Sequence, residues 1–147
     1  MSTQPFAEVY KNAVYRGGDM AFSLSETPTG TQPFAGRRFA FVTAYNPRSQ
    51  PLSGEENQKR HRELEREIQR LGLESAPGSG ASPDGSWFEE GFILFGVGLE
   101  PALELGRRFE QHAILWGEGG KVGLAWCEDG RIEWFYPQAL PTEGGIP

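Results

Sequence analysis

The chain has 147 residues, with 14 Lys and Arg against 20 Asp and Glu and a formal net charge of −6. This length fits one domain with a single hydrophobic core, and the acidic balance argues against a protein that binds nucleic acid mainly through its phosphates. The one cysteine, Cys127, excludes an internal disulfide.

No segment has the ~20 apolar residues of a membrane span, and no basic start followed by an apolar run indicates a signal peptide. We therefore expect a soluble, cytoplasmic protein. Residues 1–147 should form a single domain, with a core over about residues 37–136 and an irregular tail over residues 137–147.

The first elements are short. Apolar residues at helical spacing predict an amphipathic helix over residues 6–14, with Thr3 as a cap and Gly17-Gly18 as its end. A strand is expected over Met20–Leu24. The segment 25–36, which contains two prolines and no apolar period, should be a surface loop.

The most informative stretch begins at Phe39. Residues 39–45 are apolar on both faces, as in a central strand, and the run ends at Asn46-Pro47 because proline cannot donate to a ladder. A helix should then run from Ser53 to about Leu71, because Ser53-x-x-Glu56 has the spacing of a capping box. This helix is mostly a solvated, mixed-charge surface.

The second half alternates strands with turns and one further helix. Pro77–Gly85 is expected to be a loop, and Pro101–Phe109 a helix that begins at a proline. The expected strands are Leu73–Ala76, Trp87–Val97, His112–Trp116, Val122–Cys127 and Ile132–Tyr136.

Between Phe39 and Cys127 the order of elements is strand, helix, strand, strand, helix, strand. This order predicts an α+β two-layer sandwich with a ferredoxin-like β-α-β-β-α-β core, extended by the N-terminal segment and by C-terminal antiparallel strands. The Phe39 strand would lie between the Trp87 and His112 strands and antiparallel to both. Another α+β arrangement is the alternative.

In this topology, polar residues from several element ends meet at one edge of the sheet. Glu89 and Glu90 are adjacent in a strand and should point to opposite sides, so at most one of them joins this polar cluster. The candidate ligand-binding residues are Thr43, Asn46, Ser53, Asn57, Trp87, Glu89, Glu90 and Gln111.

Several of these residues also carry a resemblance to a known family. The pattern consists of Thr43–Pro47, Leu52-Ser53 with Asn57, Trp87–Phe92 and Phe109–Ile114. It resembles the uncharacterised bacterial family catalogued as domain of unknown function 3293, over Tyr10 to about Leu115. The resemblance supports the fold unit and the polar cluster, and it implies no activity.

Three hypotheses about function follow. The leading one is a small bacterial binding or regulatory domain, with a small molecule or a protein at the polar edge around Asn46, Asn57, Glu90 and Gln111. The second is a hydrolase or nuclease-like enzyme that uses Glu89 or Glu90 as a general base, with His61 or His112 as proton carrier. No catalytic residue is assigned.

The third is a structural or assembly protein, for example a homodimer. Its interaction surface would consist of aromatic side chains of the C-terminal third. The alternative is that these side chains are buried in the protein's own core. Val122, Leu124 and Trp126 would share one face with Ile132, Trp134 and Tyr136.

No cofactor is predicted, because the two histidines and the single cysteine match no zinc spacing. A Mg²⁺ ion held by one Glu and amide oxygens stays an alternative. A nucleic-acid or membrane partner is not expected.

Overall fold

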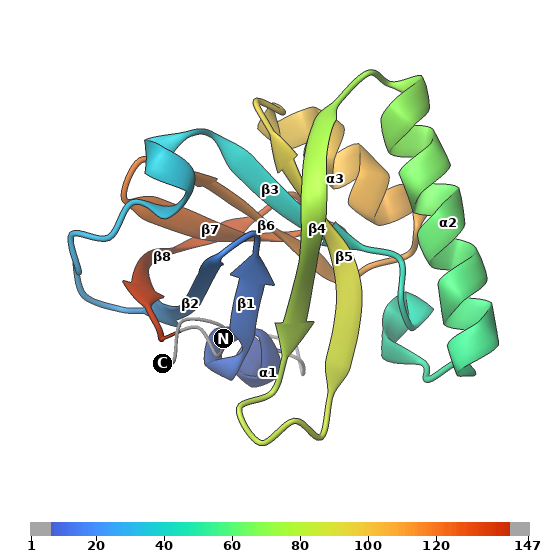
Figure 1. The fold of residues 1–147 in the computed structure, drawn as a ribbon, viewed down its shortest axis with the longest axis horizontal. Coiled ribbons are helices and arrows are strands. Elements are labelled where there is room, and N and C mark those ends of the chain that lie inside the picture. Colours follow the sequence, from blue (N-terminus) through green and yellow to red (C-terminus); the bar gives the residue numbers. More distant parts are fainter. Residues whose placement is uncertain (1–6, 142–147) are drawn as a thin grey trace.

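The strand that begins at Phe39 is apolar on both faces, and the fold buries both of them. All five residues of β3 (Phe39–Thr43) are buried, and alternate residues point to opposite sides of the sheet. The computed structural model describes residues 7–141. In it the sheet curls around one face of β3, and helices cover the other (Figure 1).

Eight antiparallel strands close into a barrel in the order β1-β2-β8-β7-β6-β3-β5-β4, and β4 pairs with β1. The other strands are β1 (Val14–Gly17), β2 (Met20–Ser25), β4 (Glu74–Ala81), β5 (Phe88–Phe95), β6 (Ala113–Glu118), β7 (Lys121–Trp126) and β8 (Ile132–Ala139). The α-helices are α1 (Ala7–Asn12), α2 (Gly54–Arg70) and α3 (Leu99–Arg108).

The ferredoxin-like, two-layer α+β sandwich expected from the sequence is wrong. That sheet has two open edges, whereas here β1 and β2 connect β4 to β8 and close the barrel. The prolines and glycines of residues 77–85 predicted a loop, but β4 continues to Ala81. Pro77, which has no N–H to donate, lies just before the pairing with β1 begins at Gly78, so the ladder tolerates it.

The expected neighbours of β3 are confirmed. It pairs antiparallel with β5 on one side and with β6 on the other. The capping box is also confirmed, because Ser53 Oγ accepts a hydrogen bond from the Glu56 backbone N–H while Ser53 N donates to Glu56 Oε1. The helix expected over Pro101–Phe109 is α3, and it begins two residues earlier, at Leu99.

The two ends of the chain differ from expectation. The helix predicted over residues 6–14 ends at Asn12, and Val14 begins β1. At the other end, β8 continues to Ala139 and pairs with β2, although irregular structure was expected from Pro137. The expected cap Thr3 lies outside the described residues. Among the described helices, none combines the length and the apolar character that crossing a membrane requires.

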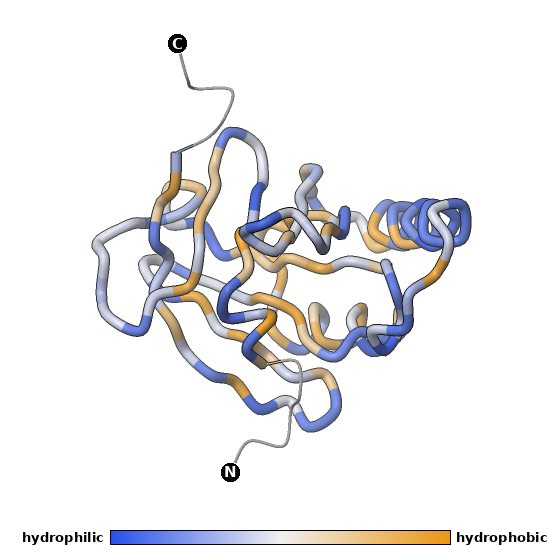
Figure 2. The backbone as a smooth tube through the Cα atoms, turned by 90° about the horizontal axis from the view of Figure 1, so that it is seen from below, coloured by the Kyte–Doolittle hydropathy of each residue, from blue (hydrophilic) through white to orange (hydrophobic). Residues whose placement is uncertain are grey.

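The barrel separates two hydrophobic cores. The inner core is rich in aromatic side chains, including Phe39, Phe41 and Trp126, whereas the outer core packs β3, β5 and β6 against α2 and α3. Figure 2 shows hydrophobic positions gathered on the strands, while α2 is mostly hydrophilic. The helix α2 has a narrow apolar stripe that includes Leu64 and Ile68, and charged side chains occupy most of its other positions. The apolar side of α2 therefore faces the sheet, and its charged sides face solvent.

Some of the C-terminal aromatic residues are buried inside the barrel, and others lie outside it. Trp126 and Phe135 are buried inside the barrel, whereas Trp134 is exposed on its outer surface. The expectation that Trp126 and Trp134 share a face is wrong, because the β7–β8 register pairs Val122 with Phe135. It is therefore Phe135 that joins the inner core.

Closure of the barrel predicts an energetic coupling between Gly17 of β1 and Ile93 of β5, which lie on either side of β4. A Cβ atom at Gly17 would lie 2.6 Å from Ile93 Cγ1, because the Ile93 side chain extends from β5 past Gly78 of β4 to β1. Gly17→Ala should therefore lower the free energy of unfolding by about 1–3 kcal/mol. In an Ile93→Ala background, which removes the obstructing carbon, the same change should cost less by about 1 kcal/mol or more.

Urea denaturation of the four proteins measures this coupling. Gly54→Ala is the matched control, since an added Cβ there meets no atom within 4 Å. Equal costs of Gly17→Ala in both backgrounds would contradict the close approach of β1 to Ile93.

Candidate functional site

Four chain segments meet at one end of the barrel. They are the connection between β3 and α2, the start of β5, the turn between α3 and β6, and α1. The sequence predicted the meeting of the first three. Direct hydrogen bonds join Asn46 to Glu89 and Gln111 to the backbone oxygen of Tyr45.

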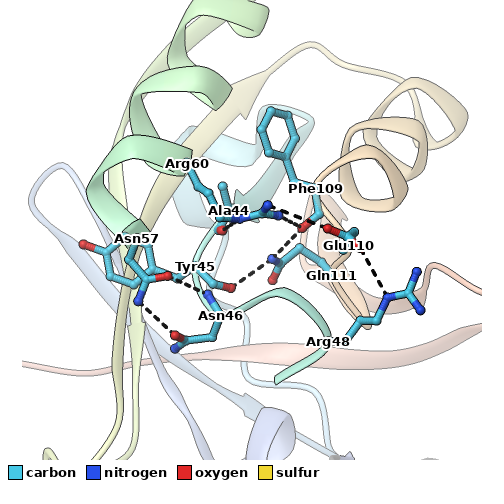
Figure 3. Close-up of polar contacts among 9 residues, drawn as sticks. All are labelled: Ala44, Tyr45, Asn46, Arg48, Asn57, Arg60, Phe109, Glu110 and Gln111. Carbon is cyan, nitrogen blue, oxygen red and sulfur yellow. Dashed lines mark hydrogen bonds and ion pairs between the residues drawn. The ribbon is translucent and has the colours of Figure 1, made fainter. Parts of the chain in front are cut away.

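Asn46 is the centre of the polar cluster (Figure 3). It has the left-handed backbone conformation, with φ of 46°, which asparagine tolerates better than most residues. Its Oδ1 accepts hydrogen bonds from Leu52 N at 3.0 Å and Asn57 Nδ2 at 2.9 Å, and its backbone N–H donates to Asn57 Oδ1 at 2.9 Å. These bonds hold the connection between β3 and α2 in place, so the first role of Asn46 and Asn57 is structural.

Thr43 and Ser53, two further candidates, also have structural bonds. Thr43 Oγ1 donates to the Glu90 backbone oxygen at 2.5 Å and accepts from Tyr45 N at 3.1 Å. Ser53 caps α2 and is exposed. Neither residue needs a ligand to satisfy its hydroxyl group.

The two adjacent acids point to opposite sides of β5, as predicted. Glu90 faces α2, where its Oε1 accepts hydrogen bonds from Tyr45 OH and Gln58 Nε2, both at 2.9 Å. Burial, followed by the hydrogen bond with Glu90, raises the pKa of Tyr45 to about 12. Glu90 therefore belongs to the contact between β5 and α2, although the leading hypothesis had placed it at the ligand site.

Glu89 is on the barrel side and is only 8% exposed. Its Oε2 accepts hydrogen bonds from Asn46 Nδ2 at 2.9 Å and from Trp87 Nε1 at 3.2 Å. Burial raises the pKa of Glu89 to about 7, and these two hydrogen bonds oppose that shift. Within residues 7–141, both hydrogen bonds to this carboxylate reach Oε2 and none reaches Oε1.

Glu89 lies at the boundary of two cavities. The outer one, which we call the mouth cavity, has a volume of about 180 Å³. The inner one, of about 20 Å³, extends toward Phe41 and Leu115 and has room for about one water molecule. Tyr10, Trp87 and Glu89 line both cavities. The described residues that line the mouth cavity are Val9, Tyr10, Asn46, Ser49, Pro51, Trp87, Glu89, Gln111 and His112.

Four of the eight candidate residues line the mouth cavity, namely Asn46, Trp87, Glu89 and Gln111. Thr43 lines only the inner cavity, and Ser53, Asn57 and Glu90 line neither. Sequence reasoning missed the contribution of α1. The apolar spacing of Tyr10 matched a core stripe, and nothing local indicated that α1 would lie at the end of a closed barrel.

A larger hollow of about 440 Å³ lies on the other side of Gln111 and His112. Its arginines are paired with acids, Arg48 with Glu110 at 3.5 Å and Arg107 with Glu104 at 3.4 Å. Burial raises the pKa of its Cys127 to about 12, so this thiol is not an activated nucleophile. Although it is larger, this hollow offers less distinctive chemistry than the mouth cavity.

Arg60 is a second residue whose structural role was not predicted from the sequence, because it lies in a helix that was expected to be a solvated, mixed-charge surface. Its Nε donates to Ala44 O at 2.8 Å and its Nη2 to Phe109 O at 2.6 Å (Figure 3). Gln111 Nε2 also donates to Phe109 O, at 3.1 Å. Together these side chains tie the end of β3 to the end of α3.

The clamp formed by Arg60 leads to a stability prediction. Arg60→Lys retains the charge but cannot reach both carbonyl oxygens with a planar fork, so it should lower the free energy of unfolding by about 1–3 kcal/mol. Chemical denaturation measures this loss. Arg62→Lys, at an exposed position of the same helix, should change stability by less than about 0.5 kcal/mol. Equal effects of the two changes would rule out the clamp.

The raised pKa of Glu89 predicts how stability depends on pH. The folded protein holds this proton more tightly than the unfolded chain does, whose ordinary value is 4.5. The contribution of Glu89 to the free energy of unfolding is therefore fully present below pH 4.5 and is lost as the pH rises to about 7. Glu89→Gln, which stays neutral, should not show this loss.

Relative to the wild type, Glu89→Gln should thus gain stability by roughly 2–3 kcal/mol between pH 5 and pH 8. Urea denaturation at a series of pH values measures the difference. Glu90→Gln changes the neighbouring acid on the opposite face and serves as the comparison. A constant difference between Glu89→Gln and the wild type would disprove the assignment.

The part of the chain that the structure describes contains no group of three or more His, Cys, Asp or Glu side chains that could hold a metal ion. The arrangement is instead that of a closed antiparallel barrel with a buried carboxylate at the inner boundary of a small cavity.

The comparison with family models assigns the chain to a family. A model described as "Protein of unknown function (DUF3293)" matches residues 42–114, about half of the 147-residue chain, and the chain belongs to this family. The match confirms the resemblance noted from the sequence, over a shorter span than Tyr10 to Leu115. It includes Asn46, Glu89 and Gln111 but not α1. No curated protein and no solved structure matches the chain.

Proposed function

We propose that this protein binds a small polar molecule in the mouth cavity. The observation that carries the proposal is the buried carboxylate of Glu89. Its Oε2 is held by two neutral donors, whereas Oε1 accepts no hydrogen bond from residues 7–141. An oxygen with hydrogen-bonding capacity to spare, on a buried side chain at the boundary of a cavity, suits a ligand-binding site.

The shape of the protein supports this proposal. Eight-stranded barrels have an interior that side chains fill or that holds one small ligand, and ligand sites occur at the mouths of barrels. Here aromatic side chains fill the interior, so space for a ligand lies at the end of the barrel. A cavity of roughly 150 Å³ holds benzene. The mouth cavity, at about 180 Å³, therefore suits a molecule about the size of one six-membered ring.

The lining combines apolar contact with a few directed polar groups. Tyr10 and Trp87 supply aromatic surface, while Glu89 and Gln111 supply hydrogen-bonding groups. Asn46 serves this arrangement by holding Glu89 Oε2, and its bonds to Asn57 and Leu52 keep it in position. In this proposal the structural network orients the group that meets the ligand.

The proposal is tested by filling the cavity. Val9 lines the mouth cavity from α1 and is 45% exposed, so Val9→Trp should place bulk in the cavity without disturbing the barrel core. A library of ring-sized polar fragments is screened by ligand-observed NMR against the wild type. Fragments that bind the wild type should lose about tenfold or more in affinity for Val9→Trp.

Glu8→Trp is the matched control, because Glu8 is an exposed residue on the same helix that does not line the cavity. Fragments should bind this variant as they bind the wild type. If no fragment distinguishes Val9→Trp from Glu8→Trp, the mouth cavity is not a binding site.

A further inference from the structure

We infer that the ligand of the mouth cavity is a small organic cation, with an amine, amidine or guanidine group that donates to Glu89 Oε1. This inference deepens the proposed function and rests on it. It depends on a comparison between two buried acids, Glu67 and Glu89, and the positive charges that described residues place beside each of them.

A second buried acid provides the comparison. Glu67 of α2 is 9% exposed and is bound by two arginines, Arg70 of the same helix and Arg108 of α3. Arg70 Nε and Arg108 Nη1 each lie 3.0 Å from its carboxylate. The hydrogen bond from Arg70 is the main cause that lowers the pKa of Glu67. At Glu67, a buried carboxylate that joins α2 to α3, the chain thus provides two positive partners.

Glu89 is as well buried as Glu67, but no Lys or Arg among residues 7–141 pairs with its carboxylate. The described residues that line the mouth cavity include no Lys or Arg, and the two donors to Glu89, Asn46 and Trp87, are neutral. A buried carboxylate without a positive partner is costly. A cationic ligand would supply a positive charge at Oε1, the oxygen to which no described residue donates a hydrogen bond.

The rest of the lining also favours a donor-rich cation. Both hydrogen bonds that join the Gln111 side chain to described residues are donated by its Nε2, so its Oε1 can accept from a ligand. Tyr10 and Trp87 are aromatic, and aromatic faces attract cations. An amidine or guanidine group has several N–H donors and no acceptor of comparable strength, which matches these two oxygens.

Other titratable groups near Glu89 bear on the pH dependence. The other titratable side chains that line the two cavities are Tyr10 from α1, Tyr15 from β1 through the inner core, and His112 before β6. Burial raises the pKa of both tyrosines, so both stay neutral near pH 7. Lys11 of α1 pairs with Glu8 and Glu133, and Glu90 faces α2.

Binding of a cation should therefore be coupled to the release of a proton from Glu89. Only the ionised carboxylate forms the ion pair, and burial raises the pKa of Glu89 to about 7. The affinity for a permanently charged cation should accordingly rise about tenfold between pH 6 and pH 8. A neutral ligand that accepts a hydrogen bond from protonated Glu89 would show the opposite trend.

Methylguanidine and N-methylurea are matched probes, because they have similar size and shape and differ in charge. NMR titration of the ¹⁵N-labelled protein measures both affinities through the Trp87 indole N–H, which donates to Glu89. Trp87→Phe identifies this signal among the four tryptophans. At pH 8 methylguanidine should bind about tenfold or more tightly than N-methylurea.

Two variants locate the effect. Glu89→Gln should lose about tenfold or more of its affinity for methylguanidine, and Glu90→Gln should bind it as the wild type does; circular dichroism verifies that both are folded. Equal or tighter binding of N-methylurea, an affinity that falls from pH 6 to pH 8, or no binding of methylguanidine overturns the inference. The fragment screen with Val9→Trp decides separately whether the mouth cavity binds ligands, so the two failures are distinguishable.

Discussion

The pairing of β1 with β4 is the contact on which the rest of this structure depends. It turns an open sheet into a barrel and lets aromatic side chains such as Phe39 and Trp126 bury themselves inside it. The approach is close because Gly17 faces Gly78 across this pair, where Ile93 fills the space that side chains would need. Closure also brings α1 to the end of the barrel, where Tyr10 and Val9 complete the mouth cavity.

The polar cluster at this end combines two roles, and Asn46 takes part in both. The bonds between Asn46 and Asn57, together with the Arg60 clamp, satisfy backbone groups where β3 ends, and such groups cannot stay unpaired when buried. Glu89 is different, because the donors that residues 7–141 provide to its buried carboxylate are both neutral. The bonds of Asn46, Asn57 and Arg60 explain how the connection between β3 and α2 is held. The buried carboxylate of Glu89 is the feature that a purely structural role does not explain.

The candidate site was partly predictable. Strand periodicity separated Glu89 from Glu90, and the order of elements correctly placed β5 and β6 beside β3. Which of the two acids faces a cavity could not be predicted, because both sides of β5 are covered, one by α2 and the other by the barrel. Arg60 was missed because Lys59 and Arg62, the nearby basic residues of α2, are exposed and because its partners, Ala44 and Phe109, are distant in the chain.

The sequence by itself determined the features that depend on near neighbours in the chain. The capping box at Ser53, the amphipathic helix that follows and the alternating faces of β5 all depend on residues a few positions apart. Only the tertiary structure decided the closure of the barrel, the place of α1 and the environment of Glu89. Each of these requires contact between segments far apart in sequence, and a local pattern contains no information about which distant backbone will complete a strand's hydrogen bonds.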